Sequence, residues 1–278
     1  MAAYEAVKAL KEKYPIKHLC EAVGISRSSY YKWLKRKPSK DEQRLKRLKQ
    51  VISEVYHQHT GIYGYRRITI YLNHYKKIKV NHKCVYRLMR LMGLKAVIRR
   101  KKYNYRPSKA IHVSENRLDR KFTADKAYQK LLTDVTEFQL TNGQKAYLSA
   151  ILDLGTNKIV AYKLGRSNNN PLVLNTFKQI QSKIIADETL IHSDRGYQYT
   201  SHAFAQFIKD TQAIQSMSRV GKCIDNGPME NFFGILKSEL YYLNKYDTFE
   251  KLLNDIDQYI HFFNTKRVRL KMGLAIPA

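Results

Sequence analysis

The sequence has few acidic residues: 23 Asp and Glu against 51 Lys and Arg, a formal net charge of +28. This imbalance disfavours a cationic partner and indicates that the protein binds a polyanion. The three cysteines, at 20, 84 and 223, form no CxxC pair, so neither a disulfide framework nor a zinc module is indicated. The sequence also lacks an apolar run of ~18 residues and an N-terminal signal-peptide pattern. We therefore expect a cytoplasmic protein that does not enter a membrane.

The positive charge is concentrated in the first half of the chain. Residues 1–128 hold 33 Lys and Arg against 9 Asp and Glu, whereas residues 129–278 hold 18 against 14. The apolar fraction of 44% indicates a folded protein throughout. This asymmetry favours a nucleic-acid-binding region joined to a region with another role, and a generally basic or ribosome-associated protein is the alternative.

Residues 1–37 are expected to form a helix-turn-helix domain. Gly24-Ile25 predicts the turn, and Ser26 is placed to cap a third helix that buries Tyr30, Trp33 and Leu34. Three helices that pack without contacting DNA are the alternative. The side chains that this third helix would offer to a DNA groove are Arg27, Ser28, Ser29 and Lys32.

Residues 38–94 indicate a second domain resembling a helix-turn-helix. A helix from 82 to 92, capped by Asn81 and closed by Gly93, carries Val85, Leu88, Met89 and Met92 at helical spacing. With few acids nearby, contact with phosphate is favoured over a merely solvated basic face. The candidate DNA contacts of this domain are Arg66, Arg67, Lys83, Arg87 and Arg90.

Residues 95–128 are basic and irregular, and we expect a linker. The segment carries Arg99, Arg100, Lys101 and Lys102, followed by two tyrosines. Such a segment can become ordered on DNA through charge and stacking, or it can serve as a plain connector.

Residues 129–245 predict an α/β domain. Strands are expected at 131–140, 146–154, 159–164, 189–192 and 213–217, and helices at 171–185, 202–210 and 228–241. Three antiparallel strands followed by helix-strand-helix-strand-helix predict a ribonuclease H-like five-stranded mixed sheet with flanking helices. An amphipathic helix follows in a C-terminal extension, 246–278.

Three acids stand out within this domain. Asp134 lies on the first expected strand, Asp194 follows the fourth, and Glu230 opens a helix, with 35 residues between Asp194 and Glu230. Because the first and fourth strands are neighbours in such a sheet, we expect the carboxylates to converge, and their repulsion favours bound cations. Carboxylate oxygens suit two Mg²⁺ or Mn²⁺ ions, which support in-line displacement at a phosphodiester.

Several long motifs in order resemble the OrfB transposases of two-reading-frame insertion sequences, DDE enzymes with a retroviral-integrase-like core. The resemblance covers nearly the whole chain. The motifs that carry it are Gly24-Ile25-Ser26-Arg27-Ser28, Tyr63-Gly64-Tyr65-Arg66-Arg67, Val80-Asn81-His82-Lys83, Thr133-Asp134-Val135-Thr136, His192-Ser193-Asp194-Arg195-Gly196 through Ser201, Ser216-Met217-Ser218-Arg219, Asp225-Asn226 through Glu230-Asn231-Phe232-Phe233, and Lys237-Ser238-Glu239.

The resemblance implies specific roles. Asp134, Asp194 and Glu230 are the catalytic and metal-binding triad, and Lys237 is a basic residue near the DNA strand. Two Mg²⁺ or Mn²⁺ ions are the implied cofactors. Double-stranded DNA is the implied partner, both as the terminal inverted repeats of the element and as the target. The resemblance also implies that the chain forms a homo-oligomer on paired ends and is associated with the nucleoid. An upstream-frame OrfA partner or fusion is also implied, but no OrfA region is visible in this sequence.

Other polar residues have competing interpretations. Asp153 is either a fourth acid of the site or an ordinary strand acid, and His192 either lies near the metals or is simply buried. We expect Asp225 and Asn226 to brace the Glu230 helix rather than bind metal. The main hypothesis is a transposase that cleaves DNA and transfers a 3′-hydroxyl end. A DNA-binding regulator with an inactive core and a nuclease that does not join ends are the alternatives.

Overall fold

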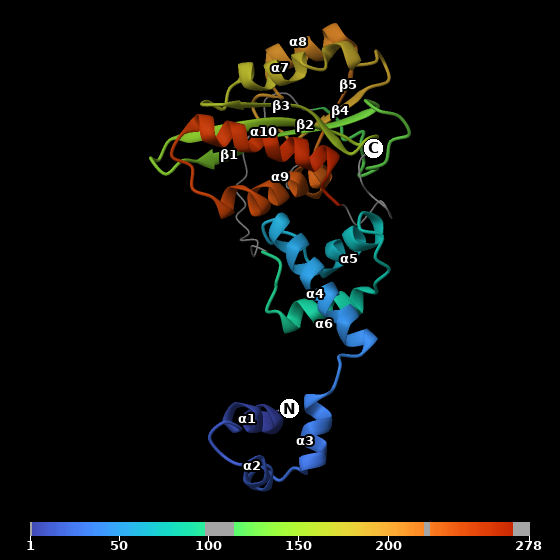
Figure 1. The fold of residues 1–278 in the computed structure, drawn as a ribbon. Helices are drawn as coiled ribbons and strands as arrows, with labels where there is room; N and C mark the ends of the chain where they lie inside the picture. Colours follow the sequence, from blue (N-terminus) through green and yellow to red (C-terminus); the bar gives the residue numbers. More distant parts are fainter. Residues whose placement is uncertain (1, 98–113, 220–222, 269–278) are drawn as a thin grey trace. The chain divides into compact units, whose positions relative to one another are not determined.

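The computed structural model describes residues 2–97, 114–219 and 223–268 (Figure 1). The chain divides into two compact units, residues 1–57 and residues 58–278, and each is described by itself. The basic residues Arg99, Arg100, Lys101 and Lys102 lie outside the described residues. Within the described part of the chain, no helix is long and apolar enough to cross a membrane.

The first unit contains three short helices around a small core. Val7, Cys20 and Tyr30 are buried there, and Trp33 packs against them half-buried. Leu34 was expected in this core, but it is 43% exposed because it lies at the end of its helix, one residue beyond Trp33. The helices of the unit are α1 (Ala2–Leu10), α2 (Ile16–Ala22), α3 (Arg27–Leu34) and α4 (Lys40–Gln58).

Local signals in the first unit fix the helix boundaries. Gly24 adopts a φ of +67° in the turn before α3, and the backbone N–H of Ser29 donates to Ser26 Oγ at 3.1 Å. At the start of α4, Ser39 and Glu42 form a reciprocal capping box, with each backbone N–H donating to the other side chain. The predicted turn and the Ser26 cap are therefore confirmed.

The second unit begins with two helices, α5 (Tyr65–His74) and α6 (His82–Leu91), which contact each other. Asn81 caps α6 by accepting the N–H of Lys83 at 2.9 Å, as predicted. Of the expected apolar stripe, Val85, Leu88 and Met89 are buried, whereas Met92 is only half-buried because it lies beyond the last helical residue.

A five-stranded mixed sheet forms the larger part of the second unit. The strand order is β3-β2-β1-β4-β5; the first three strands are antiparallel, and β4 is parallel to both β1 and β5. This topology is the ribonuclease H-like arrangement predicted from the sequence. The strands are β1 (Lys130–Gln139), β2 (Lys145–Asp153), β3 (Lys158–Gly165), β4 (Leu190–Ser193) and β5 (Ile214–Met217).

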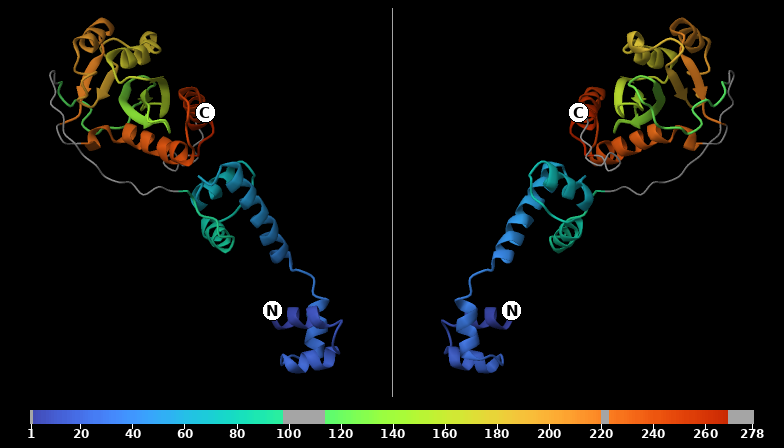
Figure 2. Two further views of the ribbon diagram at one scale, coloured as in Figure 1. Left: turned by 90° about the vertical axis from the view of Figure 1, so that its left-hand side faces the viewer. Right: turned by 90° about the vertical axis from the view of Figure 1, so that its right-hand side faces the viewer.

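Helices cover both faces of the sheet (Figure 2). On one face Leu132 and Phe138 of β1 pack with α9 and α10, and on the other face Leu131 packs with α7 and α8. Successive residues of a strand point to opposite faces, so one strand supplies both cores. The helices are α7 (Asn170–Lys178), α8 (His202–Thr211), α9 (Gly227–Glu239) and α10 (Phe249–Thr265), with short 3₁₀ turns at Gln181–Lys183, Cys223–Asn226 and Tyr241–Leu243.

Two of these helices differ from the predictions. The helix expected at 171–185 ends at Lys178, because the chain turns there and buries Ile180 in the same core as Phe177. The helix expected in a C-terminal extension is α10, whose Leu252, Ile256 and Phe263 belong to the main core beside the sheet. It is thus an integral layer of the domain, since its apolar stripe has no other surface to cover.

Both edges of the sheet carry additional polar contacts. At the β3 edge, the Asn264 side-chain amide donates to the Ile159 carbonyl and accepts the Ile159 N–H, both at 2.9 Å. At the β5 edge, the backbone N–H groups of Arg117 and Leu118 donate to Ser216 Oγ. The described end of the expected linker, residues 114–128, therefore packs on the sheet, because buried Leu118 completes the core and the Ser216 hydroxyl binds its backbone.

Gly155, in the turn between β2 and β3, is the position where the fold tolerates a side chain least. A Cβ atom there would lie 2.2 Å from the Lys126 carbonyl oxygen. We expect Gly155→Ala to lower the free energy of unfolding by about 2 kcal/mol or more, because two backbone segments must separate. Urea unfolding followed by circular dichroism measures the effect.

Gly234 of α9 provides the matched control for this substitution. It is exposed, and an added Cβ would meet nothing within 4 Å. Gly234→Ala should stabilise the protein by up to about 1 kcal/mol, the difference in helix propensity. Equal stability of the two variants would show that the close approach of Gly155 to Lys126 does not constrain the fold.

Candidate active site

The register of β1 and β4 brings two of the predicted acids together. The parallel strands pair Leu131 with Ile191 and Leu132 with His192, and extending the same register by two residues sets Asp134 alongside Asp194. Neighbouring strands lie ~4.8 Å apart. Asp194 directly follows the carboxyl end of β4, the edge at which open α/β sheets bind ligands.

The third acid reaches the same place through the start of α9. Asp134 has the parity of Leu132, so it points to the face of the sheet covered by α9, and Glu230 lies in the first turn of that helix. Asn226, immediately before α9, donates from Nδ2 to the Thr133 carbonyl at 3.1 Å. This bond joins the residue before Asp134 to the start of the Glu230 helix and so braces the helix, as predicted for Asn226.

The electrostatics of Asp134 agree with this placement. Burial raises the pKa of its carboxyl well above the usual aspartate value, and the negative charges of Asp194 and Glu230 raise it further. The Val135 N–H, which donates to Asp134 Oδ1 at 2.7 Å, and the charge of Lys237 act in the opposite direction. The charges of both other predicted acids therefore act on Asp134.

The three carboxylates do not converge on a single point. In residues 2–97, 114–219 and 223–268, no three His, Cys, Asp or Glu side chains are grouped tightly enough to hold one metal ion. Asp134 and Asp194 are half-buried, while Glu230 is exposed at the surface of α9. The arrangement is a central aspartate with one acid on β4 and another on α9.

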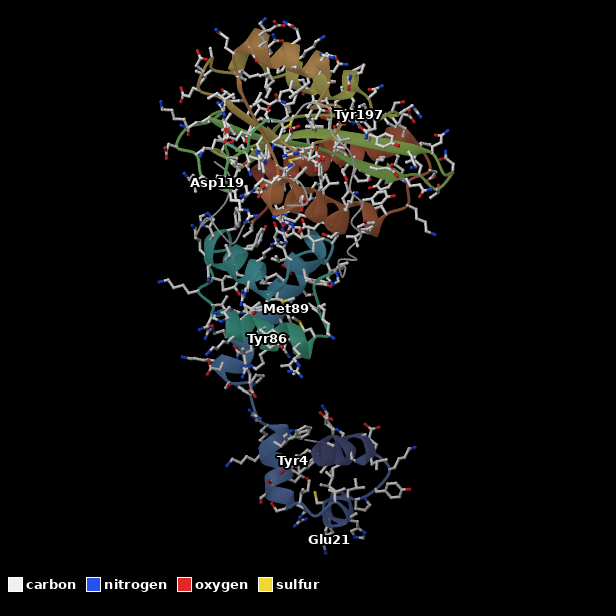
Figure 3. All side chains as sticks on the ribbon, turned by 180° about the vertical axis from the view of Figure 1, so that it is seen from behind. Tyr4, Glu21, Tyr86, Met89, Asp119 and Tyr197 are labelled. Carbon is white, nitrogen blue, oxygen red and sulfur yellow. The ribbon has the colours of Figure 1, made fainter. Side chains whose placement is uncertain are left out.

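The loop after Asp194 holds that carboxylate in place. The Gly196 N–H donates to Asp194 Oδ1 at 2.9 Å, and a Cβ at position 196 would lie 2.9 Å from the same oxygen. The loop is fixed by Tyr197 and Gln198, which donate to the backbone and side-chain oxygens of Asn168, respectively; Figure 3 labels Tyr197. A side chain at position 196 would displace the Asp194 carboxylate, a constraint that the sequence analysis missed although the Asp-Arg-Gly spacing carried the signal.

Lys237 lies two turns after Glu230 on α9. Its charge lowers the pKa of Asp134, so it lies within electrostatic range of the site, and its Nζ lies 5.3 Å from the centroid of the Phe138 ring. The predicted position of this cation, on the same helix face as Glu230, agrees with these interactions.

Asp225 is a structural acid. Its buried carboxylate binds Arg219 and Arg120 at 2.8–3.0 Å and accepts the Asn116 amide at 2.9 Å. The hydrogen bonds from Arg219 and Arg120 hold the pKa of Asp225 far below its usual value although burial opposes them. The residue ties the segment before the sheet to the segment before α9, which agrees with the expected bracing role.

Two more predicted polar residues have structural roles. His192 is fully buried and its ring nitrogens bond Ser216 Oγ at 2.9 Å and Ser218 Oγ at 3.1 Å; burial lowers the pKa of this imidazole to about 4. Asp153 is fully buried and accepts the N–H groups of Tyr128, Gly155 and Thr156. The interpretations of a buried histidine and an ordinary strand acid fit these contacts.

Glu239 anchors the other end of α9. Its carboxylate binds Arg267 at 2.7 and 2.8 Å, Arg67 at 3.0 Å and the Tyr259 hydroxyl at 2.8 Å. Burial alone would raise the pKa of Glu239, but the hydrogen bonds and charges of the two arginines bring it below the usual value. The prediction that Arg67 contacts DNA does not fit, because its side chain is only 22% exposed and its guanidinium is paired with an acid 172 residues away.

The other residues predicted to contact DNA that the structure describes lie on exposed surfaces, with one exception. Ser29 differs from them, because it is half-buried and its hydroxyl bonds Tyr4 at 2.9 Å. The exposed candidates are Arg27, Ser28 and Lys32 on α3, Arg66 on α5, and Lys83, Arg87 and Arg90 on α6.

Family models match both parts of the chain. A homeodomain-like model matches residues 3–43, and an HTH-like model matches residues 42–102. Two integrase core domain models match residues 124–223 and 230–275. Together these ranges contain the sheet and all three acids. The chain thus combines helix-turn-helix regions with an integrase core, the class of the polynucleotidyl transferases.

Several relatives match most of the chain. The InsK protein of insertion sequence element IS150 of Escherichia coli is 38% identical over 96% of this chain and 94% of its own length. The transposase of IS904 of Lactococcus lactis is 35% identical over 87% of this chain and 96% of its own length. The chain belongs to the insertion-sequence transposases that have an integrase core, a family that typically depends on a divalent metal.

Among solved structures, the chain aligns with the catalytic core domain of HTLV-2 integrase at a TM-score of 0.42 and 19% identity. That alignment covers 52% of this chain and 91% of the integrase chain. This level of similarity supports no further argument.

Asp134 on β1 and Asp153 on β2 should respond oppositely to neutralisation of the carboxylate. The raised pKa of Asp134 means that the folded state binds its proton more tightly than the unfolded state, so ionisation destabilises the fold as the pH rises above the usual aspartate value. Asp134→Asn should therefore raise the melting temperature at pH 7 by a few degrees when chelator keeps divalent ions away. Differential scanning calorimetry measures this.

Asp153→Asn is the comparison. It removes a carboxylate that accepts backbone N–H groups and should cost about 1–3 kcal/mol. A loss of stability in Asp134→Asn as large as in Asp153→Asn would contradict the electrostatic description of the site.

Proposed function

We propose that this transposase cleaves DNA at the ends of its element and joins the resulting 3′-hydroxyl to a target phosphodiester at Asp134, Asp194 and Glu230. The observation that carries the proposal is the placement of the three acids: the β1–β4 register sets Asp134 alongside Asp194, and the Asn226–Thr133 hydrogen bond holds the start of the Glu230 helix against the same strand. Membership of the insertion-sequence transposases supports the reaction class. The identity of the three catalytic residues is the part that we infer.

The donor set fits two Mg²⁺ or Mn²⁺ ions. All three side chains supply hard carboxylate oxygens, which Mg²⁺ and Mn²⁺ prefer. Burial and the charges of Asp194 and Glu230 raise the pKa of Asp134, and bound cations would favour its ionised form. Asp134, Asp194 and Glu230 would hold the ions, whose chemistry when bound would be to activate the attacking oxygen and to stabilise the leaving oxygen of the phosphodiester.

The protein's own groups would position the reactants. The Gly196 N–H orients the Asp194 carboxylate, and Asn226 keeps the start of α9 against β1. Lys237, in the field of Asp134, is placed to bind a phosphate of the strand that enters the site. These fixed positions hold a strand for in-line attack, which is a large part of the catalysis of phosphoryl transfer.

We further propose that double-stranded DNA is bound through both helical regions. Arg27, Ser28 and Lys32 on α3 would contact one groove, and the exposed basic face of α6 would contact backbone phosphates. Terminal inverted repeats and target DNA are the proposed ligands. Because two ends must be joined in one event, more than one copy of the chain would assemble on paired ends.

An additional OrfA portion, as partner or fusion, is a proposal that rests on the family resemblance alone. The probable transposase of IS1353 of Shigella flexneri matches 97% of this chain but only 52% of its own length, so longer chains exist among the relatives. Strand transfer should therefore also be measured with an OrfA portion supplied, as a partner or as a fusion.

The catalytic proposal predicts that Asp194→Asn binds terminal-repeat DNA like the wild type but loses strand transfer by more than about a hundredfold, because a direct ligand should matter more than its supporting groups. Gel assays with labelled ends in Mg²⁺ or Mn²⁺ measure binding, cleavage and joining separately. Asp187→Asn, at an exposed position before β4, is the matched control and should remain active.

Three results separate the competing functions. Joined products from wild type and none from Asp194→Asn support the transposase. Cleaved but unjoined ends in sequenced products indicate a nuclease. Binding without cleavage or joining, even with an OrfA partner, indicates a DNA-binding regulator, an interpretation that the three intact acids disfavour.

The binding proposal predicts that the double variant Arg27→Ala/Lys32→Ala lowers the slope of log affinity against log salt by about 1.8, since each lost phosphate contact removes about 0.9. Fluorescence anisotropy on duplex DNA at several salt concentrations measures the slope. Lys178→Ala, an exposed cation on α7, should leave it unchanged. An unchanged slope in the double variant would exclude α3 as a phosphate-contacting helix.

A further inference from the structure

A pocket of about 810 Å³ lies within the second unit, where α5 and α6 meet α9. Its volume is within the range of about 300–1,000 Å³ typical of ligand pockets. Most of its surface comes from apolar and aromatic side chains. Those that matter here are Tyr65, Tyr86, Met89, Leu94 and Ile235, and Figure 3 labels Tyr86 and Met89 on α6.

One wall of the pocket is built from two tyrosines and an arginine. The rings of Tyr65 and Tyr86 meet edge to face with centroids 5.1 Å apart, and the Arg66 guanidinium lies 5.7 Å from the Tyr65 ring centroid. Tyr86 is 50% exposed although it lies beside apolar neighbours. A half-exposed aromatic ring at the mouth of a pocket is suited to stacking on a flat ligand.

The charge of the pocket is positive. Arg66, Arg90 and Lys95 line it, and they are all exposed to solvent. Among the described residues that line it, Glu239 is the acid, and its carboxylate is already bound by Arg67 and Arg267. The complementary ligand therefore has a flat apolar part and a negatively charged part.

We propose that this pocket receives an unpaired nucleobase of the DNA substrate, with the base stacked on Tyr86 and the adjoining phosphates held by Arg66, Arg90 and Lys95. Base stacking on aromatic side chains, combined with a basic surface along the backbone, is the general mode of single-strand recognition. A base in an intact duplex cannot enter, so the ligand is a frayed, overhanging or extruded nucleotide, for which the unpairing cost is least.

The position of the pocket relates it to the catalytic helix. Ile235 and Ser238 belong to both α9 and the pocket lining, and Ser238 lies eight residues after Glu230. At 1.5 Å per residue this is about 12 Å along the helix, the length of about three to four nucleotides of a DNA strand. The inference rests on the proposed function, because that function brings a DNA strand to Glu230.

The test compares two DNA probes in chelator, so that no catalysis takes place. One probe is a blunt 20-base-pair duplex, and the other is the same duplex with a six-nucleotide single-stranded tail carrying 2-aminopurine at successive positions. We expect wild type to bind the tailed probe about tenfold more tightly, as the loss or gain of one base stack implies. We also expect 2-aminopurine fluorescence to change at one tail position and not at its neighbours.

Three variants locate the effect at the pocket. Tyr86→Ala should bind both probes with nearly equal affinity while keeping the wild-type affinity for the blunt duplex, and Tyr86→Phe should keep the tail preference because the ring remains. Tyr75→Ala removes another half-exposed tyrosine that does not line the pocket and should behave like wild type. Thermal unfolding of all variants checks that each is folded.

Several results would overturn the proposal. The wild type could show no preference for the tailed probe. Tyr86→Ala could keep the preference, or it could lose affinity equally for both probes. A change in the mass of the assembly in Tyr86→Ala with the tail preference intact would assign the pocket to contacts between copies instead. Asp194→Asn should retain the tail preference, so failure of strand transfer and failure of base binding are distinguishable.

Discussion

The mutual repulsion of carboxylates around Asp134 is the constraint on which the catalytic half of this protein depends. The parallel pairing of β1 with β4 extends toward Asp194, and the Asn226–Thr133 hydrogen bond holds the Glu230 helix against the same strand. Each contact moves negative charges closer and works against the stability of the ion-free fold. The fold is stable despite this repulsion because the sheet and the surrounding helices form two large apolar cores that fix the strands.

Helix α9 is held at both ends by polar contacts that reach other elements. Its start is tied to β1 through Asn226, and its end is tied through Glu239 to Arg67 of α5 and to Arg267 beyond α10. The helix that carries Glu230 is therefore also the helix on which the α5–α6 region is fixed. A buried charged network of this kind adds little net stability but strongly penalises alternative arrangements, since moving one partner leaves a buried charge unpaired.

The fold and the candidate acids were largely predictable, because both rest on local signals. Strand alternation, the Asn142-Gly143 turn and the helix caps at Ser26 and Asn81 predicted the elements, and the chain order of strands and helices predicted the sheet. The failures share one cause. Arg67 was predicted to contact DNA because the acid that pairs with it, Glu239, lies 172 residues away in the sequence. Residues 114–128 were predicted to be part of a linker because the residues that they contact lie on the distant strand β5. Sequence spacing does not show pairings between distant segments.

The two sheet edges also bear on how copies of this chain associate. Asn264 occupies the backbone donor and acceptor of Ile159 on β3. On β5 the backbone N–H of Met217 donates to the Glu115 carbonyl at 3.4 Å, and the Ser216 hydroxyl accepts the Leu118 N–H. An edge strand whose hydrogen-bonding groups are already used cannot template another strand at those positions. Continuous sheets running from one subunit into the next are therefore disfavoured at those positions, and any association of copies would have to use other surfaces of the domain.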